Sequence, residues 1–176
     1  MYFKRTLESF FARYIRIENK TLKEFLAEIL GTFILAIFAL STIAQYKFFR
    51  RDNPNEGTVL SINIGTGFGV TIGIIIVGKV SGGHFNPAVS FAMLLTRRLG
   101  LFRFFVYCLG QFIGAFLGSL MVYLVYYDAL KSYGKDMYSL ETASIFATYP
   151  NKNVSISGCF VDQTFVTALL GKSTYL

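Results

Sequence analysis

Three long apolar runs constrain the fold of this chain more than any other feature of its 176 residues. They cover residues 25–46, 59–78 and 104–127, and within them only Glu28 carries a charge. The hydrocarbon core of a bilayer is about 30 Å thick, so a helix of about 20 apolar residues can cross it. Each run has that length. The sequence therefore predicts an all-α membrane protein with three transmembrane helices.

The basic residues are divided unevenly between the two sides that such helices would create. The formal net charge is +7, and ten of the 17 Lys and Arg residues lie before the first run or between the second and third. Six lie on the connections that would face the other side. Cytoplasmic segments carry the excess of Lys and Arg. We therefore expect residues 1–24 to form a cytoplasmic tail, and this division by side argues against a nucleic-acid partner.

Residues 128–159 are predicted to form an extracellular and irregular connection. The segment is polar, contains Gly134, Pro150 and Gly158, and has no apolar run long enough to span. Its triplet Asn153-Val154-Ser155 matches the acceptor pattern for N-glycosylation, which makes Asn153 a candidate modification site.

No motif for catalysis, cofactor binding or metal binding is found. The chain has a single histidine, and its two cysteines, Cys108 and Cys159, have no metal-ligand spacing. The tail GKST at 171–174 imitates the end of a phosphate-binding loop, but Val166 stands where the required glycine would be. We expect no enzyme, no cofactor and no metal.

The stretch SGGHFNPAVS at 81–90 interrupts the apolar pattern. The helix that would follow, 86–96, is about 16 Å long, half of a bilayer core. We therefore expect 81–96 to form a re-entrant loop and half-helix, with Asn86 as its cap and Pro87 in the first helical position. Non-helical backbone at membrane depth is tolerated inside protein or beside a water-filled cavity, so residues 81–85 should line such a cavity.

Hydrogen-bond acceptors and donors in that loop would bind the hydroxyl groups of molecules that pass through the membrane. Carbonyls of Gly82, Gly83 and His84 would accept hydrogen bonds, Phe85 would complete the lining, and the Asn86 amide would donate. The His84 side chain has two open interpretations, a pore-lining group and a tucked ring that braces the loop.

Glycines recur every four residues in two of the apolar runs, and residues four apart share a helix face. Such small-residue ridges let membrane helices approach closely, which predicts tight helix packing. The two ladders are Gly65, Gly69 and Gly73, then Gly110, Gly114 and Gly118.

The motif Asn86-Pro87-Ala88 within SGGHFNPAVS resembles the first asparagine–proline–alanine signature of the aquaporin family. The resemblance extends from about residue 21 to 170 and is closest to the aquaglyceroporins. It implies a plasma-membrane channel for passive passage of water, glycerol and small neutral solutes, with the lipid bilayer around it and a family tetramer as its assembly. The supporting stretches are FLAEILGTF (25–33), SINIGTGFGVT (61–71), GQFIGAFLGS (110–119), YYDAL (126–130), TASIFATYP (142–150) and VDQTFVTALL (161–170).

The resemblance also assigns individual residues. Thr66, twenty residues before Asn86, corresponds to the outer constriction, where the family usually has an aromatic ring; a threonine would widen that point. Glu28 resembles a buried glutamate that braces the re-entrant loops, although a residue so near the start of its span could instead reach water at the interface. Gln163 would be its counterpart in the fourth segment.

Family members contain two inverted repeats, and this chain matches one. Residues 25–127 form the first repeat, a truncated fourth helix begins near Ile156 with its span at 160–170, and 171–176 is a tail unlike the family. We expect the chain alone to be non-conducting, with residues 156–176 lying at the outer interface or hanging outside the membrane. The alternative is a truncated isoform that binds full-length relatives and modulates their assembly.

Overall fold

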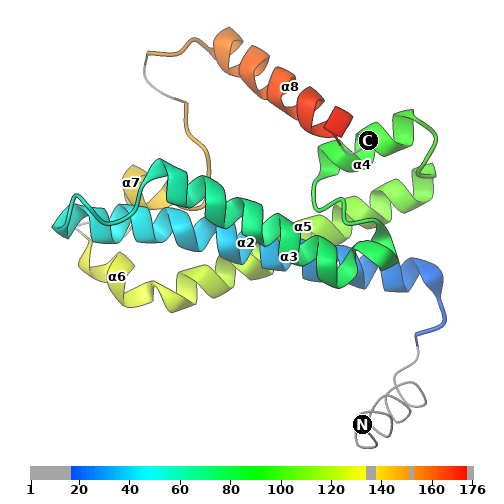
Figure 1. Ribbon diagram of the computed structural model, residues 1–176, viewed down its shortest axis with the longest axis horizontal. Helices are drawn as coiled ribbons and strands as arrows, with labels where there is room; N and C mark the ends of the chain where they lie inside the picture. The colour runs from blue at the N-terminus through cyan, green and yellow to red at the C-terminus, as the bar shows by residue number, and fades with distance from the viewer. Residues whose placement is uncertain (1–16, 134–137, 151–152, 174–176) are drawn as a thin grey trace, which may run out of the picture.

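The computed structural model describes residues 17–133, 138–150 and 153–173, and within these ranges every regular element is a helix. Helices α2, α3 and α5 lie side by side along the longest dimension of the molecule, and α4 lies near one end of them (Figure 1). These three helices are long and apolar enough to cross a membrane. The helices are α2 (Lys20–Asp52), α3 (Val59–Ser81), α4 (Pro87–Leu95), α5 (Leu101–Val125), α6 (Tyr127–Ser132), α7 (Leu140–Ala143) and α8 (Ile156–Ser173).

Helix α2 is the centre of the bundle, because both α3 and α5 pack against it. It begins where the Asn19 side chain accepts a hydrogen bond from the Leu22 N–H at 3.1 Å, a helix cap. Residues 20–24, which the sequence analysis placed in the tail, are therefore helical, and the helix continues six residues past 46. The apolar run marks the part that fits the bilayer core, while the helix extends into the polar region at each end. Residues 1–16 lie outside the described part of the chain.

The two glycine ladders both face α2. A side chain at Gly69 would meet Phe38 Cβ at 2.8 Å, and one at Gly110 would meet the Phe25 carbonyl oxygen at 3.0 Å. A side chain at Gly114 would overlap the carbonyl oxygen of Ile29. The ladders therefore let two helices approach the backbone of a shared third helix, which is the close approach that such ridges permit in lipid.

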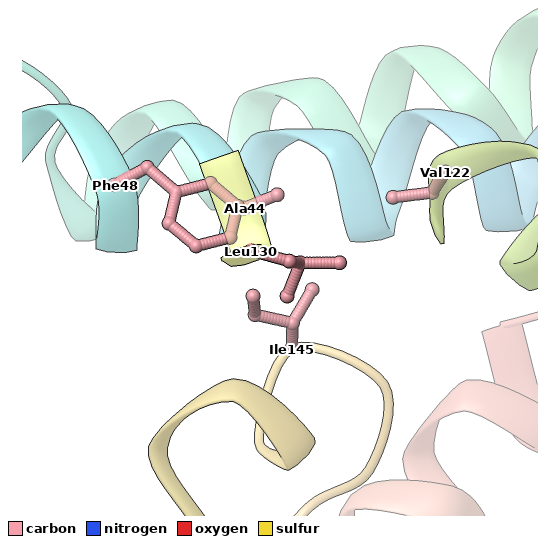
Figure 2. Packing of buried hydrophobic residues seen from close by; sticks show 5 residues of the cluster. All are labelled: Ala44, Phe48, Val122, Leu130 and Ile145. Carbon is pink, nitrogen blue, oxygen red and sulfur yellow. The ribbon is translucent and has the colours of Figure 1, made fainter. Parts of the chain in front are cut away.

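The end of the bundle opposite α4 is closed by an apolar cluster. Figure 2 shows Ala44 and Phe48 of α2 beside Leu130 of α6, with Ile145 pointing toward Leu130 from the segment after α7. Leu130 and Ile145 are 2% and 1% exposed. The prediction that 128–159 is irregular is therefore wrong for α6 and α7, which form because these apolar side chains have a surface to cover. Asn153 is exposed in the turn before α8.

Helix α8 differs from its predicted form in two respects. It runs from Ile156 to Ser173, so it starts before 160 and passes residue 171, where a tail was expected; residues 174–176 lie outside the described part. It packs against α4 rather than lying clear of the molecule, and its last described residues come near α4 (Figure 1). This contact shows that α8 does not hang free of the molecule, while its place at the outer interface stays a prediction.

Candidate functional site

The chain reverses direction between α3 and α4 through a loop of positive backbone angles. Gly82 and Gly83 have φ of 91° and 68°, values that glycine adopts without strain, and Phe85 has φ of 50°. The Gly82 N–H closes α3 by donating to the Gly78 carbonyl at 2.8 Å. The two glycines thus make the sharp approach that allows α4 to start beside the end of α3.

Asn86 caps the half-helix α4. Its side-chain oxygen accepts a hydrogen bond from the Ala88 N–H at 2.8 Å, and Pro87 occupies the first turn. The Asn86 side chain is half-buried, and no hydrogen bond of its Nδ2 to a described residue is seen. The cap therefore orients the amide so that its nitrogen is available as a donor beside the positive end of α4.

Glu28 of α2 holds the loop from below. It is fully buried, and its Oε1 accepts from the Ser81 hydroxyl at 2.6 Å and from the His84 N–H at 3.1 Å. Its Oε2 accepts from the Phe85 N–H at 2.9 Å and from Gln111 Nε2 at 2.7 Å. A buried carboxylate is tolerated when it is hydrogen-bonded this fully, so the interpretation in which Glu28 reaches water at the interface is wrong.

A second group of polar side chains joins the loop to α5. Gln111 Nε2 also donates to Ser90 Oγ at 2.9 Å, and Ser90 Oγ lies 3.0 Å from His84 Nδ1. The His84 ring is held 4.9 Å from the ring of Tyr107, centre to centre. His84 is therefore both braced, through Nδ1, and half-exposed on the loop.

Tyr107 and an ion pair between a buried glutamate and a half-exposed arginine secure the end of α3 where the loop begins. The Tyr107 hydroxyl donates to the Ser81 carbonyl at 2.8 Å. One helical turn earlier, Arg103 binds the carboxylate of Glu24 through Nε at 2.8 Å and through Nη2. Glu24 is 1% exposed, and a paired, bidentate geometry is what a buried charge requires. The pair fixes α2 to α5 beside the loop.

Phe85 does not line an open cavity, contrary to the sequence analysis. Its side chain is 5% exposed and packs with Ala27 and Val77 in a small apolar core. A Cβ atom on Gly31 would overlap its ring, and one on Gly73 would come within 2.9 Å of it. The two glycines make room for the ring, and burial of an aromatic side chain favours this position over an exposed one.

Gln163 and Thr66 do not reach the loop. Gln163 lies exposed on α8, where its amide contacts the neighbouring Asp162 at 3.4 Å, so the structure does not bring it to the loop as a brace. Thr66 is half-buried on α3, and its hydroxyl donates to the Ile62 carbonyl at 2.9 Å. It precedes Ser81 by fifteen residues, about 22 Å along a helix.

Ser90, Gln111 and Tyr107 were not identified from the sequence, although one signal was present. Gln111 is an amide in an otherwise uncharged apolar run, and polar groups inside membrane helices mark functional or packing sites. Ser90 and Tyr107 carry no such signal, because serine and tyrosine are common in membrane helices.

The arrangement presents hydrogen-bonding groups to a small polar molecule and offers little for covalent chemistry. Among the described residues, no three His, Cys, Asp or Glu side chains come together as metal ligands. Gly82 is exposed, and Gly83, His84 and Asn86 are half-exposed, so one face of the loop is open while Glu28 occupies the other.

Known proteins are similar to this chain in sequence and in fold. The family model described as Major intrinsic protein matches residues 16–175. The chain is 41% identical to human aquaporin-9 over 164 residues, covering 91% of this chain and 55% of that protein. It is 37% identical to aquaporin-7 of Mus musculus over 158 residues, covering 88% of this chain and 51% of that protein. The chain thus spans about half the length of these relatives.

A solved structure agrees with the computed fold. The X-ray structure of the aquaglyceroporin from Plasmodium falciparum superposes with a TM-score of 0.69 at 26% sequence identity. The match covers 81% of this chain and 55% of the other.

Proposed function

Because the chain belongs to the major intrinsic protein family, in its aquaglyceroporin type, whose members are membrane channels and not enzymes, we propose that these 176 residues supply the first half of a channel for water, glycerol and small neutral solutes. The chain spans about half the length of the relatives it matches, and a second repeat completes the pore in this proposal. Residues 25–127 form the first repeat of this channel, and its setting is the plasma membrane, with the N-terminus in the cytoplasm.

The observation that carries this proposal is the loop braced by Glu28. Three of its four hydrogen bonds hold the re-entrant segment in place from one side, and the fourth comes from Gln111 of α5, which leaves the opposite face of the loop to a passing molecule. On that face, carbonyls of Gly82, Gly83 and His84 accept, and the Asn86 amide donates. A neutral solute with hydroxyl groups exchanges its water for these groups, while the positive end of α4 opposes cations.

Thr66 supports a preference for solutes larger than water. It is the position that matches the outer constriction of the family, and its hydroxyl is turned back to its own helix. A threonine occupies less volume than an aromatic ring, so it leaves a wider passage for a polyol in a completed pore.

We infer that the chain alone conducts little. Its loop face is closed by no described element of the same chain, and polar backbone at membrane depth requires protein or a water-filled cavity against it. A second repeat would supply that cover in a complete pore.

Vesicle permeability tests this proposal. The osmotic shrinkage in glycerol is compared for three sets of vesicles. One set holds the purified chain, one holds the chain co-expressed with the second half of a relative, and one is empty. We expect permeability near that of empty vesicles for the chain alone and a clear increase for the combination. If vesicles that hold the chain with the second half of a relative show no increase in water or glycerol flux, the channel proposal is contradicted. Strong flux through vesicles that hold the chain alone would contradict the requirement for a second half.

The open loop face also favours the second candidate function, association with full-length relatives or with a second copy of the chain. Half-exposed His84 and Asn86 need polar contacts that lipid does not provide. A fourth vesicle set, holding a full-length relative with and without the chain, measures this. Altered flux or assembly of the relative supports the modulating role, and identical flux and oligomer size count against it.

A further inference from the structure

Four polar residues from α2, the re-entrant segment and α5 form one continuous chain of hydrogen bonds. It runs from Glu28 through Gln111 and Ser90 to His84. The direction of each bond can be assigned from the chemistry of its partners, beginning at the carboxylate.

Glu28 is an acceptor only, because an ionised carboxylate has no proton to donate. Its two oxygens receive four hydrogen bonds, which equals the roughly four lone-pair sites of a carboxylate. Gln111 must therefore turn its amide nitrogen toward Glu28. The reversed orientation would place the amide oxygen of Gln111 against the acceptor-only carboxylate, which would replace a hydrogen bond with repulsion, so the orientation of this amide is fixed.

The second hydrogen of that amide nitrogen determines the role of Ser90. Gln111 Nε2 is also 2.9 Å from Ser90 Oγ, so the serine oxygen accepts from Gln111. Ser90 is fully buried, and a buried hydroxyl proton needs an acceptor. Ser119 satisfies its own proton with the carbonyl four residues earlier, at 2.7 Å, but Ser90 makes no such bond among the described residues. The acceptor that remains in reach is His84 Nδ1, at 3.0 Å.

A ring nitrogen that accepts a hydrogen bond carries no proton, so the other nitrogen of a neutral imidazole must carry it. We propose that Glu28, Gln111 and Ser90 fix His84 as the neutral tautomer protonated on Nε2, which makes it a permanent hydrogen-bond donor on the open side of the loop. In this arrangement Gln111 and Ser90 are positioning residues that act through His84.

The surroundings of Nε2 fit a donor that faces a ligand. No described residue bonds to it, and it is not among the sealed-off, unpaired side-chain atoms of the described residues, which are Thr32 Oγ1 and Gln111 Oε1. The Tyr107 ring restrains the imidazole, and the Tyr107 hydroxyl is itself held by the Ser81 carbonyl. The identity of the ligand rests on the proposed channel function: it is water or the hydroxyl group of a small neutral solute. The fixed N–H would donate a hydrogen bond to the oxygen of that molecule, while neighbouring loop carbonyls would accept hydrogen bonds from its O–H groups.

His84 is the single histidine of the sequence, so its tautomer can be measured directly. The full 176-residue chain is labelled with ¹⁵N-histidine, purified without a histidine tag, placed in lipid bilayers and kept mildly alkaline, where imidazole is neutral. We expect one imidazole signal set, with Nδ1 unprotonated and Nε2 protonated, and without the averaging between tautomers that free histidine shows in the same buffer.

Three variants separate the proposal from general effects on folding. Ser90→Ala removes the donor to Nδ1, so the signals should move toward those of free histidine. Ser90→Thr keeps the hydroxyl and should restore the single tautomer. The control Ser119→Ala removes a hydroxyl from α5 that bonds only its own helix, and it should leave the histidine signals unchanged.

Protonation of Nδ1 in the wild type, or signals equal to those of free histidine, would overturn the proposal whether or not the variants fold. Unchanged signals in folded Ser90→Ala protein would overturn it as well. The measurement involves no transport, so a failed tautomer test leaves the channel proposal standing, and failed flux restoration leaves the tautomer result standing.

Discussion

Glu28 joins three parts of the bundle at one side chain. It receives hydrogen bonds from the end of α3, from the loop and from α5. The four donors that it satisfies are buried or half-buried, and each unsatisfied buried donor costs about 1–3 kcal/mol. The carboxylate is therefore expected to contribute more to folding than a surface charge does.

We predict that Glu28→Ala lowers the free energy of unfolding by about 3 kcal/mol or more, because several donors lose their acceptor together. Thermal unfolding of the purified chain in detergent measures this. The matched control is Glu56→Ala, because Glu56 is exposed between α2 and α3 and accepts one long side-chain hydrogen bond from Asn53 at 3.3 Å. Equal melting temperatures for the two variants would show that Glu28 does not hold the loop.

The sequence could predict the loop and its cap but not the direction of every side chain in it. Two glycines followed by histidine, asparagine and proline indicate a turn and a helix start by their own conformational preferences. The prediction for Phe85 was wrong because its ring fills the space beside Gly31 of α2 and Gly73 of α3. The sequence around Phe85 does not reveal that space. The contact of Gln111 with Ser90 could not be predicted either, because it depends on how α4 and α5 are aligned along each other.

At the scale of elements, the glycine ladders provide the sharpest test of packing. Gly114 of α5 lies against the α2 backbone, where a Cβ atom would overlap the Ile29 carbonyl oxygen and approach Thr32 Cβ at 3.0 Å. Gly67 of α3 is a helix-interior glycine with no such neighbour within 4 Å. An alanine substitution is therefore expected to destabilise the bundle at Gly114 but not at Gly67.

Gly114→Ala should destabilise the bundle by about 1–3 kcal/mol, since the backbones must move apart. Gly67→Ala should be neutral or stabilising by up to about 1 kcal/mol, because alanine favours helix more than glycine does. Unfolding of both variants by denaturing detergent, followed by circular dichroism, compares them. A Gly114→Ala variant as stable as Gly67→Ala would mean that α2 and α5 do not pack this closely.

The existence of α2, α3 and α5 could be predicted because lipid imposes a length and a composition on any spanning helix. Their ends could not, since apolar content stops at the edge of the bilayer core while α2 continues through Arg50 and Arg51. The short helices α6 and α7 escaped prediction because they are stabilised by tertiary contacts, such as Leu130 with Phe48, rather than by their own sequences. Gln163 was misplaced for a similar reason, since its partners depend on where the whole of α8 packs.

At the scale of the whole molecule, the question is which end of the bundle faces the cytoplasm. The end that carries α6 and α7 holds Arg50 and Arg51, and both are committed to backbone carbonyls. Arg50 donates to the Gly57 oxygen at 2.9 Å, and Arg51 donates to the Tyr133 oxygen. The two arginines therefore stabilise loops at that end of the bundle. The opposite end carries the larger share of the basic residues. By the positive-inside rule, we predict that the end with α6 and α7 is extracellular.

We predict that a cysteine at position 138 is labelled from outside intact cells, because Tyr138 is 87% exposed just before α7. The experiment uses a chain in which Cys108 and Cys159 are replaced by serine, with Tyr138→Cys as the probe and a membrane-impermeant thiol reagent. Gly100→Cys is the matched control at the opposite end, where a new side chain meets nothing within 4 Å, and it should react only after permeabilisation. The reverse pattern, with position 100 labelled on intact cells and position 138 protected, would invert the orientation. A solute entering from outside would then meet the exposed and half-exposed loop residues Gly82, Gly83 and His84 before it met Thr66.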